Sequence, residues 1–487
     1  MNDVFSGEVL VVGGGPVGLW LAGELGLAGV RTVLVERLAE RSPHSKALGI
    51  HARTLEVFAA RGVVDEFLDN GIKVPAWHFG MLPQKPDYTG LATPYPFILA
   101  FPQSRTEEIL ERRAVALGAR ILRGREVTAL HDDDESLTAE LADGSRITAR
   151  YVVGADGAGS TVRRLAGIGF PGVDGTAFGF LGDVVLDAPP PPGLTLHNEH
   201  GALVVAPVPG GFFRLTGYDA ADQEPGRRTV TLEELRASVT RIAGTDFGLR
   251  DPNWLSRFSS ATRHAETYRK GRVFLAGDAA HMHFPAGGVG LNVGVQDAMN
   301  LGWKLAAVLR GRTAPGLLDT YHDERHPVGV DLVEHTLAQT ALLTAVSPEG
   351  RALRDLFGKL ISTQPAMARE LAEKLSGIAV RYPPPDPDAH PLTGTRVADT
   401  RQLLVSGRAV LLAPGAQELK DDAAALGIDV VDDTPDDTLD LPGITAALLR
   451  PDGHLWWATE TPDPLPASRH ALQTLTTPQN RESRTRT

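Results

Sequence analysis

The first forty residues constrain the fold more than any other stretch of this chain. An apolar run from Val9 to Val12 predicts a buried strand that leads directly into the glycine-rich segment Gly13–Gly18. A helical pattern follows from Leu19 to Ala28, and a second apolar run, Thr32 to Val35, ends on Glu36. A strand, a glycine turn, a helix and a strand ending on an acid about 20 residues beyond the glycines indicate a dinucleotide-binding fold.

Each residue type of this motif has a physical role at a phosphate site. Gly13 permits the tight turn, Gly15 lets a pyrophosphate approach the backbone, and Gly18 lets the helix pack closely on the strand. The helix N-terminus offers unpaired N–H groups to the phosphates, and Glu36 can accept hydrogen bonds from a ribose diol. A glycine turn by itself has a purely structural alternative, and the motif does not distinguish FAD from NAD(P).

The net charge and the hydropathy of the chain limit the kinds of partner that we expect. The chain of 487 residues carries a net charge of −12, which gives no electrostatic support to a nucleic-acid or anionic-membrane partner. No apolar run approaches the roughly 18–20 residues of a membrane span, and the N-terminus has no signal-peptide pattern. We therefore expect a cytoplasmic protein with small-molecule partners, and the sequence leaves open whether it is a monomer or a homodimer.

The chain contains no cysteine. This excludes disulfides, thiolate catalysis and cysteine-ligated metal or iron–sulfur sites. No metal site is predicted from the remaining residues.

The periodicity along the chain predicts an α/β fold that a β-rich segment interrupts. Helices are expected at 51–61, 106–117, 290–309 and 317–345, the last with a break near Pro327, and strands at 137–141, 146–153, 181–186, 202–208, 211–216 and 272–276. We divide the chain into the first part of a nucleotide-binding domain (1–177), a β-rich substrate domain (178–261) and the second part of the nucleotide-binding domain with its long helices (262–381).

A proline-rich linker, Tyr382–Pro387, precedes a C-terminal module at 388–480. Strands at 409–412 and 428–431, a helix at 417–426 and a hairpin around Pro451-Asp452-Gly453 predict that this module is a small α/β domain. Residues Arg481–Thr487 are expected to be a disordered tail.

Two further glycine motifs follow predicted strands. The segment Gly154–Arg163 contains Asp156-Gly157, and its structural alternative is a glycine-rich turn that the aspartate caps, which is common in isolation. Gly277-Asp278 closes the strand at 272–276, at the edge where α/β sheets bind ligands. The carboxylate of Asp278 would either accept hydrogen bonds from a polyol chain or cap a helix.

A fourth motif, Phe284–Asn292, places Gly287, Gly288 and Gly290 just before the strong helical pattern at 290–309. Glycines at these positions let a flat ring approach the backbone. The dipole of the following helix would favour negative charge on that ring, as a reduced flavin carries.

The glycine turn with Glu36, Asp156-Gly157 and Gly277-Asp278 occur in this order along the chain. As a set they resemble the class A flavoprotein monooxygenases, the para-hydroxybenzoate hydroxylase family, over about residues 8 to 345. Ser45–Gly49 with Arg53-Thr54, Pro102-Gln103 and the linker with its C-terminal module resemble, more narrowly, the bacterial aromatic polyketide hydroxylases and the rifamycin-type monooxygenases.

This resemblance implies an α/β fold of three parts. These are a discontinuous Rossmann-like FAD-binding domain, an inserted β-sheet substrate domain and a thioredoxin-like C-terminal α/β domain. Because the chain has no cysteine, that last domain cannot perform thiol redox chemistry here.

The resemblance also implies FAD as cofactor and NADPH or NADH as co-substrate. The implied cofactor-binding residues are Gly13, Gly15, Pro16, Gly18, Glu36, Arg37, Lys46, Gln103, Asp156, Gly157, Arg163, Gly277, Asp278, Pro285, Gly288, Gly290, Leu291 and Asn292. Pro285 and Gly288 are implied as catalytic residues at the reactive edge of the flavin. Lys46 departs from the arginine that is usual in relatives and lacks its bidentate fork, and Val289 departs from a frequent glutamine.

The implied reaction is the hydroxylation of a large polycyclic phenol by O2 through a flavin C4a-hydroperoxide. A rifamycin-inactivating monooxygenase, a flavin reductase or oxidase, and a flavin-binding protein without turnover are the alternatives. His281 and His283 lie near the flavin by sequence, and we expect them to cap or pack. Arg214 and Tyr218 are candidates for the roof of a substrate pocket.

Overall fold

The predicted glycine motif lies at the centre of a six-stranded sheet in the computed structural model, which describes residues 4–133, 135–224 and 229–476. Strand β2 (Val9–Val12) is parallel to β3 (Thr32–Glu36) on one side and to β11 (Tyr151–Gly154) on the other. All four residues of β2 are buried, as a strand covered on both faces requires. The spatial order is β19 (Arg269–Lys270), β20 (Val273–Leu275), β11, β2, β3 and β7 (Arg120–Arg123), with β19 antiparallel to β20 and the others parallel.

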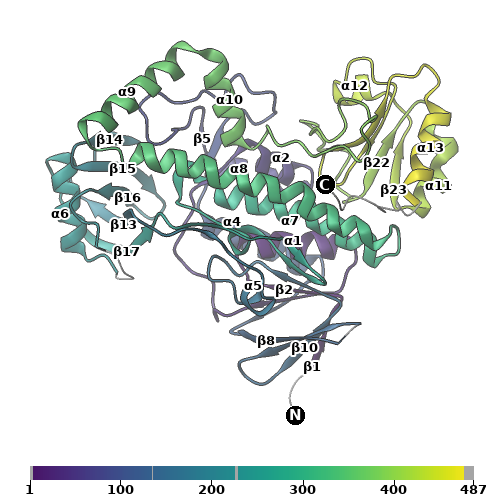
Figure 1. Cartoon of the computed structure of the whole chain (residues 1–487), viewed down its shortest axis with the longest axis horizontal. Coiled ribbons are helices and arrows are strands. Elements are labelled where there is room, and N and C mark those ends of the chain that lie inside the picture. The colour runs from purple at the N-terminus through teal and green to yellow at the C-terminus, as the bar shows by residue number, and fades with distance from the viewer. Residues whose placement is uncertain (1–3, 134, 225–228, 477–487) are drawn as a thin grey trace, which may run out of the picture.

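Helix α1 (Pro16–Leu27) follows β2 and packs against α4 (Gln103–Ala116) and α7 (Gly290–Leu309) (Figure 1). The predicted bounds of α7 are confirmed. The predicted starts of the other two helices are wrong: α1 begins at Pro16 because the first turn has no use for the N–H that proline lacks. Helix α4 begins before Thr106, whose hydroxyl donates to the carbonyl of Pro102 at 3.3 Å.

The predicted strand at 146–153 is divided between two sheets. Residues Arg146–Ala149 form β10, which pairs with β9 (Leu137–Leu141), so the predicted hairpin is confirmed. The chain then leaves this sheet at Arg150 and continues as β11 in the central sheet. The remaining strands of the smaller sheet are β1 (Val4–Ser6) and β8 (Val127–Asp132).

The inserted region is a five-stranded antiparallel sheet, so its predicted β-rich character is confirmed. Its strands lie in the order β14 (Leu194–Asn198), β15 (Gly201–Val208), β16 (Phe212–Asp219), β13 (Phe178–Leu186) and β17 (Leu249–Ser259). Helix α6 (Leu232–Ala243) contributes to the core of this sheet and was not predicted. Its sequence signal was a capping box, in which Thr231 and Glu234 bond each other's backbone N–H groups.

Helix α8 (Asp319–Leu343) runs unbroken through Pro327, so the predicted break is wrong. Tertiary contacts hold the helix on both sides of the proline. Before it, Arg325 is ion-paired to Asp297 of α7. After it, Gly329 packs so tightly that an added Cβ would lie 2.0 Å from the hydroxyl of Tyr268. These contacts outweigh the single helical hydrogen bond that a proline removes.

The C-terminal module is a four-stranded mixed sheet with helices, so its predicted α/β class is confirmed (Figure 1). Its strands lie in the order β23 (Ile428–Val431), β22 (Ala409–Leu412), β24 (Ala446–Leu449) and β25 (Leu455–Thr459). The predicted helix at 417–426 is a 3-10 turn, η4 (Ala416–Leu419), followed by α11 (Lys420–Ala425). The thioredoxin-like assignment and the domain boundaries stay predictions, and the predicted tail at 481–487 lies outside the described residues.

In Figure 1 the C-terminal module lies at one end of the molecule and the five-stranded sheet at the other, with α7 and α8 between them. No helix within the described ranges is both long and apolar enough to cross a membrane. The remaining elements are β4 (Gly49–Ile50), α2 (Ala52–Ala59), α3 (Val64–Asn70), β5 (Ile72–Val74), β6 (Ile98–Ala100), α5 (Thr161–Leu165), β12 (Gly172–Val173), β18 (Thr262–His264), η1 (Gly277–Ala279), β21 (His281–Met282), η2 (Ala286–Gly288), η3 (Pro315–Leu318), α9 (Pro348–Thr363), α10 (Pro365–Ser376), α12 (Pro435–Leu439) and α13 (Pro464–Thr476).

Candidate cofactor site

The turn between β2 and α1 is shaped by three glycines with different surroundings. Gly13 has φ +112°, and an added Cβ would lie 2.2 Å from the carbonyl oxygen of Ala155. An added Cβ on Gly18 would lie 2.0 Å from the carbonyl oxygen of Gly13. Around Gly15, in contrast, no other described residue comes within 4 Å of that position, and Pro16 opens the helix. The turn is therefore tightly packed at Gly13 and Gly18, and it leaves space for a phosphate at Gly15.

Glu36 lies at the end of β3, beside this turn. Its Oε2 accepts a hydrogen bond from the N–H of Gly14 at 2.7 Å, and its Oε1 accepts one from the N–H of Leu38 at 2.9 Å. A carboxylate has about four lone-pair positions, so this half-buried group can still accept from a ribose diol. The side chain of Arg37 is exposed next to it.

Asp156 is held by hydrogen bonds to the first turn of α5, whose N-cap residue is Ser160, in line with the turn-capping alternative left open by the sequence. Its Oδ2 accepts from the N–H groups of Thr161 and Val162 at 2.7 and 3.1 Å, and its Oδ1 accepts from the hydroxyl of Ser160 at 2.5 Å. The next residue, Gly157, has φ +80° and open space where a Cβ would lie. This loop therefore presents glycine backbone rather than a free carboxylate.

Arg163 connects this loop to the Gly277-Asp278 turn. It is buried and donates to the carbonyls of Ala158 at 2.9 Å and Ala279 at 2.8 Å, with its guanidinium 3.6 Å from the ring centre of Phe170. Two loops that are over a hundred residues apart are thus held side by side.

Asp278 is exposed and lies inside the 3-10 turn η1, whose N-cap residue is Ala276, so Asp278 does not act as a helix N-cap. It points toward the start of α7, since an added Cβ on Gly290 would lie 3.8 Å from its Oδ1 and 3.0 Å from Nε2 of His283. The N–H of Gly277 donates to Oδ2 of Asp297 at 3.1 Å. An exposed carboxylate on a turn fixed in this way is suited to a polyol ligand.

The glycine loop before α7 is held by the side chain of Asn292. Its Nδ2 donates to the carbonyls of Gly288 at 3.0 Å and Gly49 at 3.1 Å, and its Oδ1 accepts from the N–H of His51 at 2.8 Å. Pro285 is exposed on this loop and Leu291 is half-buried. Asn292 therefore holds two loops together with its whole amide group.

His51 is a member of this site that the sequence analysis missed. Its Nε2 donates to the carbonyl of Gly287 at 3.1 Å, and its Nδ1 accepts from the hydroxyl of Tyr88 at 3.3 Å. Trp77 donates to the same carbonyl at 3.0 Å. Burial lowers the pKa of His51 to about 4, so the ring is neutral with its hydrogen on Nε2. No local pattern signals this contact, because the partners are 236 residues apart.

The two histidines near Asp278 have different surroundings. His281 is fully buried and its Nε2 lies 2.7 Å from Oδ2 of Asp297. His283 donates from Nδ1 to the carbonyl of Phe284 at 2.7 Å, and burial lowers its pKa. Both positions are those of packed side chains.

Gln103 and Lys46 lie on neighbouring segments. The amide oxygen of Gln103 accepts from the N–H of Ala47 at 3.1 Å, and its nitrogen donates to Glu107 at 2.8 Å. Gln103 thus orients the loop that carries Lys46, whose side chain is exposed.

Arg214 and Tyr218, the two candidates for the roof of a substrate pocket, both lie on β16 but have different surroundings. Arg214 is buried in a two-pronged ion pair with Asp183, at 2.8 and 2.7 Å, so Asp183 neutralises its charge. Tyr218 belongs to a buried apolar cluster with Phe284 and Ala286. The five-stranded sheet therefore packs onto the loop that carries Pro285.

These loops meet at one edge of the central sheet. The glycine turn follows β2, Asp156-Gly157 follows β11, and Gly277-Asp278 follows β20, which are three adjacent strands of parallel direction. The carboxyl edge of a parallel sheet is where such folds bind nucleotides.

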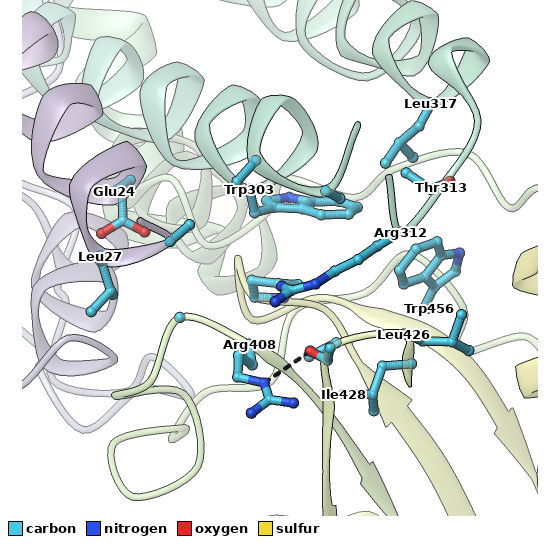
Figure 2. Close-up of a pocket in the computed structure, with 17 residues that line it drawn as sticks. Glu24, Leu27, Trp303, Arg312, Thr313, Leu317, Arg408, Leu426, Ile428 and Trp456 are labelled. Atoms are coloured by element: carbon cyan, nitrogen blue, oxygen red, sulfur yellow. Dashed lines mark hydrogen bonds between the residues drawn. The ribbon is translucent and has the colours of Figure 1, made fainter. Parts of the chain in front are cut away.

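The pocket in Figure 2 lies elsewhere, at the junction of α1 and α7 with the C-terminal module. It has a volume of about 70 Å³, and Arg312 lies between Trp303 and Arg408 within it. Arg408 donates to the carbonyl of Gly427 at 3.1 Å. This pocket contains none of the cofactor-loop residues.

Comparison with known proteins identifies the family of this chain. Residues 6–336 match the family model of the FAD binding domain, and residues 386–478 match that of the aromatic-ring hydroxylase C-terminal region. An aromatic compound monooxygenase of Bacillus subtilis, YhjG, which is described as uncharacterized, is 44% identical over 480 residues, covering 94% of this chain and 95% of its own. The chain belongs to the FAD-dependent aromatic monooxygenases.

Two further relatives of this FAD-dependent monooxygenase have named substrates. A rifampicin monooxygenase of Streptomyces venezuelae is 42% identical over 472 residues, covering 93% of this chain and 96% of its own. The structure of the anhydrotetracycline hydroxylase OxyS from Streptomyces rimosus has a TM-score of 0.86 and 40% identity, covering 95% of this chain and 98% of that one. The resemblance to this family that the sequence analysis identified is confirmed.

Proposed function

We propose that this monooxygenase hydroxylates a large polycyclic phenol, with FAD at the carboxyl edge of the central sheet and NADPH or NADH as the reductant. The observation that carries the proposal is the convergence of three glycine loops on adjacent strands, with open space at Gly15. FAD, once reduced, supplies the activation of O2.

The residues present fit FAD along its length. The pyrophosphate would lie on the Gly13–Gly18 turn, the adenosine ribose on Glu36, and the ribityl chain near Asp278. The flavin ring would lie along Gly288, Gly290 and Leu291, with Pro285 at its reactive edge. Arg37, Lys46, Gln103, Asp156, Gly157, Arg163, Gly277 and Asn292 would bind the cofactor directly or hold these loops in place.

The protein would orient the flavin and the substrate, and it would exclude water from the site. Asn292, His51 and Trp77 fix the backbone of the loop that faces the flavin. The cluster of Tyr218 with Phe284 offers an apolar surface beside the same loop, which suits an aromatic substrate. Closing an apolar sheet over the ring would keep bulk water from the reacting atoms.

Two classes of substrate are candidates, a polycyclic phenol and a rifamycin. The relatives named for anhydrotetracycline and rifampicin both support a large multi-ring phenolic compound. A rifamycin-inactivating activity is therefore the second candidate, with the same chemistry on another substrate.

The test is aerobic NADPH and NADH oxidation by the FAD-loaded protein with a panel of polycyclic phenols and rifamycins. We expect one compound to accelerate oxidation and to gain one oxygen atom by mass, and that compound names the substrate class. Oxidation that yields only peroxide with every compound would indicate a reductase or oxidase. No oxidation under any condition would indicate a flavin-binding protein without turnover and would overturn the proposal.

A further inference from the structure

The hairpin tip between β24 and β25 is inserted into the FAD-binding part of the chain. Asp452 and His454 are 3% and 2% exposed. The carbonyl of Pro451 accepts from Arg61 at 2.9 Å, and that of Asp452 accepts from Arg53 at 2.6 Å. A two-residue backbone stretch of the C-terminal module thus binds Arg53 of α2 and Arg61 just after this helix.

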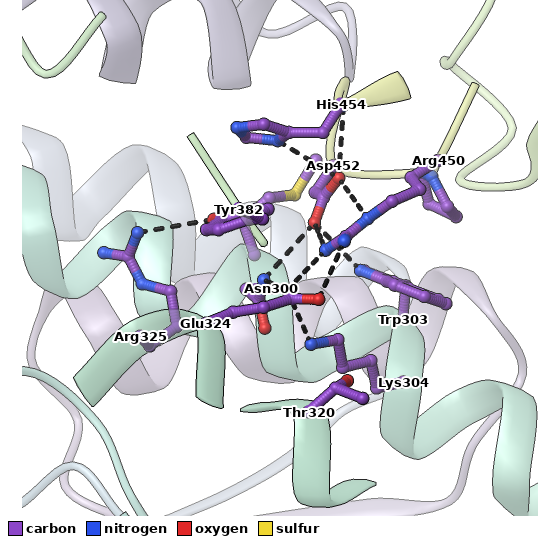
Figure 3. Close-up of polar contacts among 12 residues, drawn as sticks. Asn300, Trp303, Lys304, Thr320, Glu324, Arg325, Tyr382, Arg450, Asp452 and His454 are labelled. Carbon is purple, nitrogen blue, oxygen red and sulfur yellow. Dashed lines mark hydrogen bonds and ion pairs between the residues drawn. The ribbon is translucent and has the colours of Figure 1, made fainter. Parts of the chain in front are cut away.

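The side chains of this tip bind the two long helices (Figure 3). Oδ2 of Asp452 accepts from Nε1 of Trp303 on α7 at 3.2 Å. Arg450 forms a two-pronged ion pair with Glu324 on α8, at 2.9 and 2.8 Å. Glu324 in turn accepts from Lys304 of α7 at 2.8 Å, so the tip closes a buried cross-link between the two helices.

A second cross-link lies beside the first and reaches the cofactor loops. Arg325, next to Glu324, donates to Oδ1 of Asp297 on α7 at 2.7 Å. The other oxygen of Asp297 accepts from the N–H of Gly277 at 3.1 Å. The same carboxylate therefore holds the α7–α8 contact and the Gly277-Asp278 turn.

Tyr382 joins the two cross-links. Its hydroxyl accepts from Nη1 of Arg325 at 3.3 Å, while its ring centre lies 4.2 Å from that of His454 and 4.8 Å from the guanidinium of Arg450 (Figure 3). A path of buried contacts thus runs from the hairpin tip to the ring of Tyr382, and from there by hydrogen bonds through Arg325 and Asp297 to Gly277.

We propose that Asp452, Arg450 and Tyr382 are positioning residues of the cofactor site. They hold α7 and α8 at the spacing in which Asp297 fixes the Gly277-Asp278 turn. In this role the cysteine-free C-terminal module serves FAD binding without touching FAD. Buried charges favour such a role because each side chain has few arrangements that satisfy its partners. The last step of this inference rests on the proposed function, because it assumes that the Gly277-Asp278 turn binds FAD.

The test measures FAD affinity, the visible spectrum of bound FAD and the thermal unfolding midpoint of the full chain. Tyr382→Phe removes one hydroxyl, and Asp452→Asn removes the charge at the tip. We expect each variant to weaken FAD binding at least five-fold and to shift the flavin spectrum. The matched control is Leu411→Val, in an apolar cluster of the C-terminal module that contains none of the tip residues. It should lower the unfolding midpoint and leave FAD affinity within two-fold.

If Asp452→Asn fails to fold, Tyr382→Phe decides the question. Wild-type FAD affinity and spectrum in Tyr382→Phe would overturn the inference, as would a loss of affinity in Leu411→Val equal to that in the tip variants. Gly15→Ala separates the two proposals, because it alters the proposed FAD site and not the path. Normal FAD binding in Gly15→Ala would count against the site itself, whereas loss in Gly15→Ala alone would count against the positioning path.

Discussion

Asp297 and Arg325 form an ion pair in which neither side chain is exposed to solvent, with Nε 2.7 Å from Oδ1. Burial alone would raise the pKa of Asp297, but Arg325 and His281 together hold it below its usual range. The carboxylate also accepts the N–H of Gly277. One buried charge therefore links the packing of two long helices to the turn at the proposed FAD site.

Replacing this charge should destabilise the protein strongly. Asp297→Asn leaves Arg325 buried without a counter-charge, and we expect the free energy of unfolding to fall by about 3 kcal/mol or more. Urea denaturation measures this. Asp331→Asn is the control, because its pair with Lys374 is largely exposed and should cost less than about 1 kcal/mol. Equal losses in the two variants would contradict the role of the buried pair.

The glycine turn offers a matched pair of variants. Gly15→Ala meets no described atom within 4 Å, so the free energy of unfolding should change by less than about 0.5 kcal/mol. FAD affinity should nevertheless fall at least ten-fold, because the added methyl group occupies the approach of the pyrophosphate. Gly18→Ala would place its Cβ 2.0 Å from a carbonyl oxygen and should reduce both quantities. Unchanged FAD binding in Gly15→Ala would place the phosphate elsewhere.

Lys46 is exposed on the loop that Gln103 orients. An arginine there would present a planar fork to a phosphate, and one added hydrogen bond of about 1 kcal/mol corresponds to about a five-fold tighter complex. We expect Lys46→Arg to tighten the binding of FAD or of NADPH, which titration of each measures. Lys420→Arg, on exposed α11, controls for the general effect of the substitution. No change for either ligand would mean that this loop does not contact a phosphate.

Buried histidines should make stability fall with acidification. Burial lowers the pKa of His51 and of His454 from 6.5 to about 4. The unfolded chain therefore binds these protons first, and stability is lost as the pH falls from 6.5 towards 4. Each histidine adds a slope of up to about 1.4 kcal/mol per pH unit.

Denaturant unfolding at several pH values measures this slope. His454→Gln removes one titrating group, so its slope should be smaller than that of the wild type by the contribution of one proton. Identical slopes would show that His454 is protonated equally in the folded and unfolded states.

Local patterns predicted the elements whose partners lie nearby in the chain. The strand at Val9–Val12, the glycine turn, the presence of a helix after it and the bounds of α7 follow from hydrophobic periodicity and from glycine conformations that short segments already require. The strands at 409–412 and 428–431 were predicted for the same reason. Family membership was also evident from the order of the glycine motifs.

Contacts between distant segments decided the rest. Arg146–Ala149 and Tyr151–Gly154 belong to different sheets because their partners differ, and α8 continues through Pro327 because packing on both sides holds it. His51 reaches Gly287 across 236 residues, and Arg61 reaches Pro451 across 390. The sequence by itself determined the local elements and the family, since these depend on neighbouring residues. Only the tertiary structure decided which buried charges meet, because their pairing depends on distances that no local pattern contains.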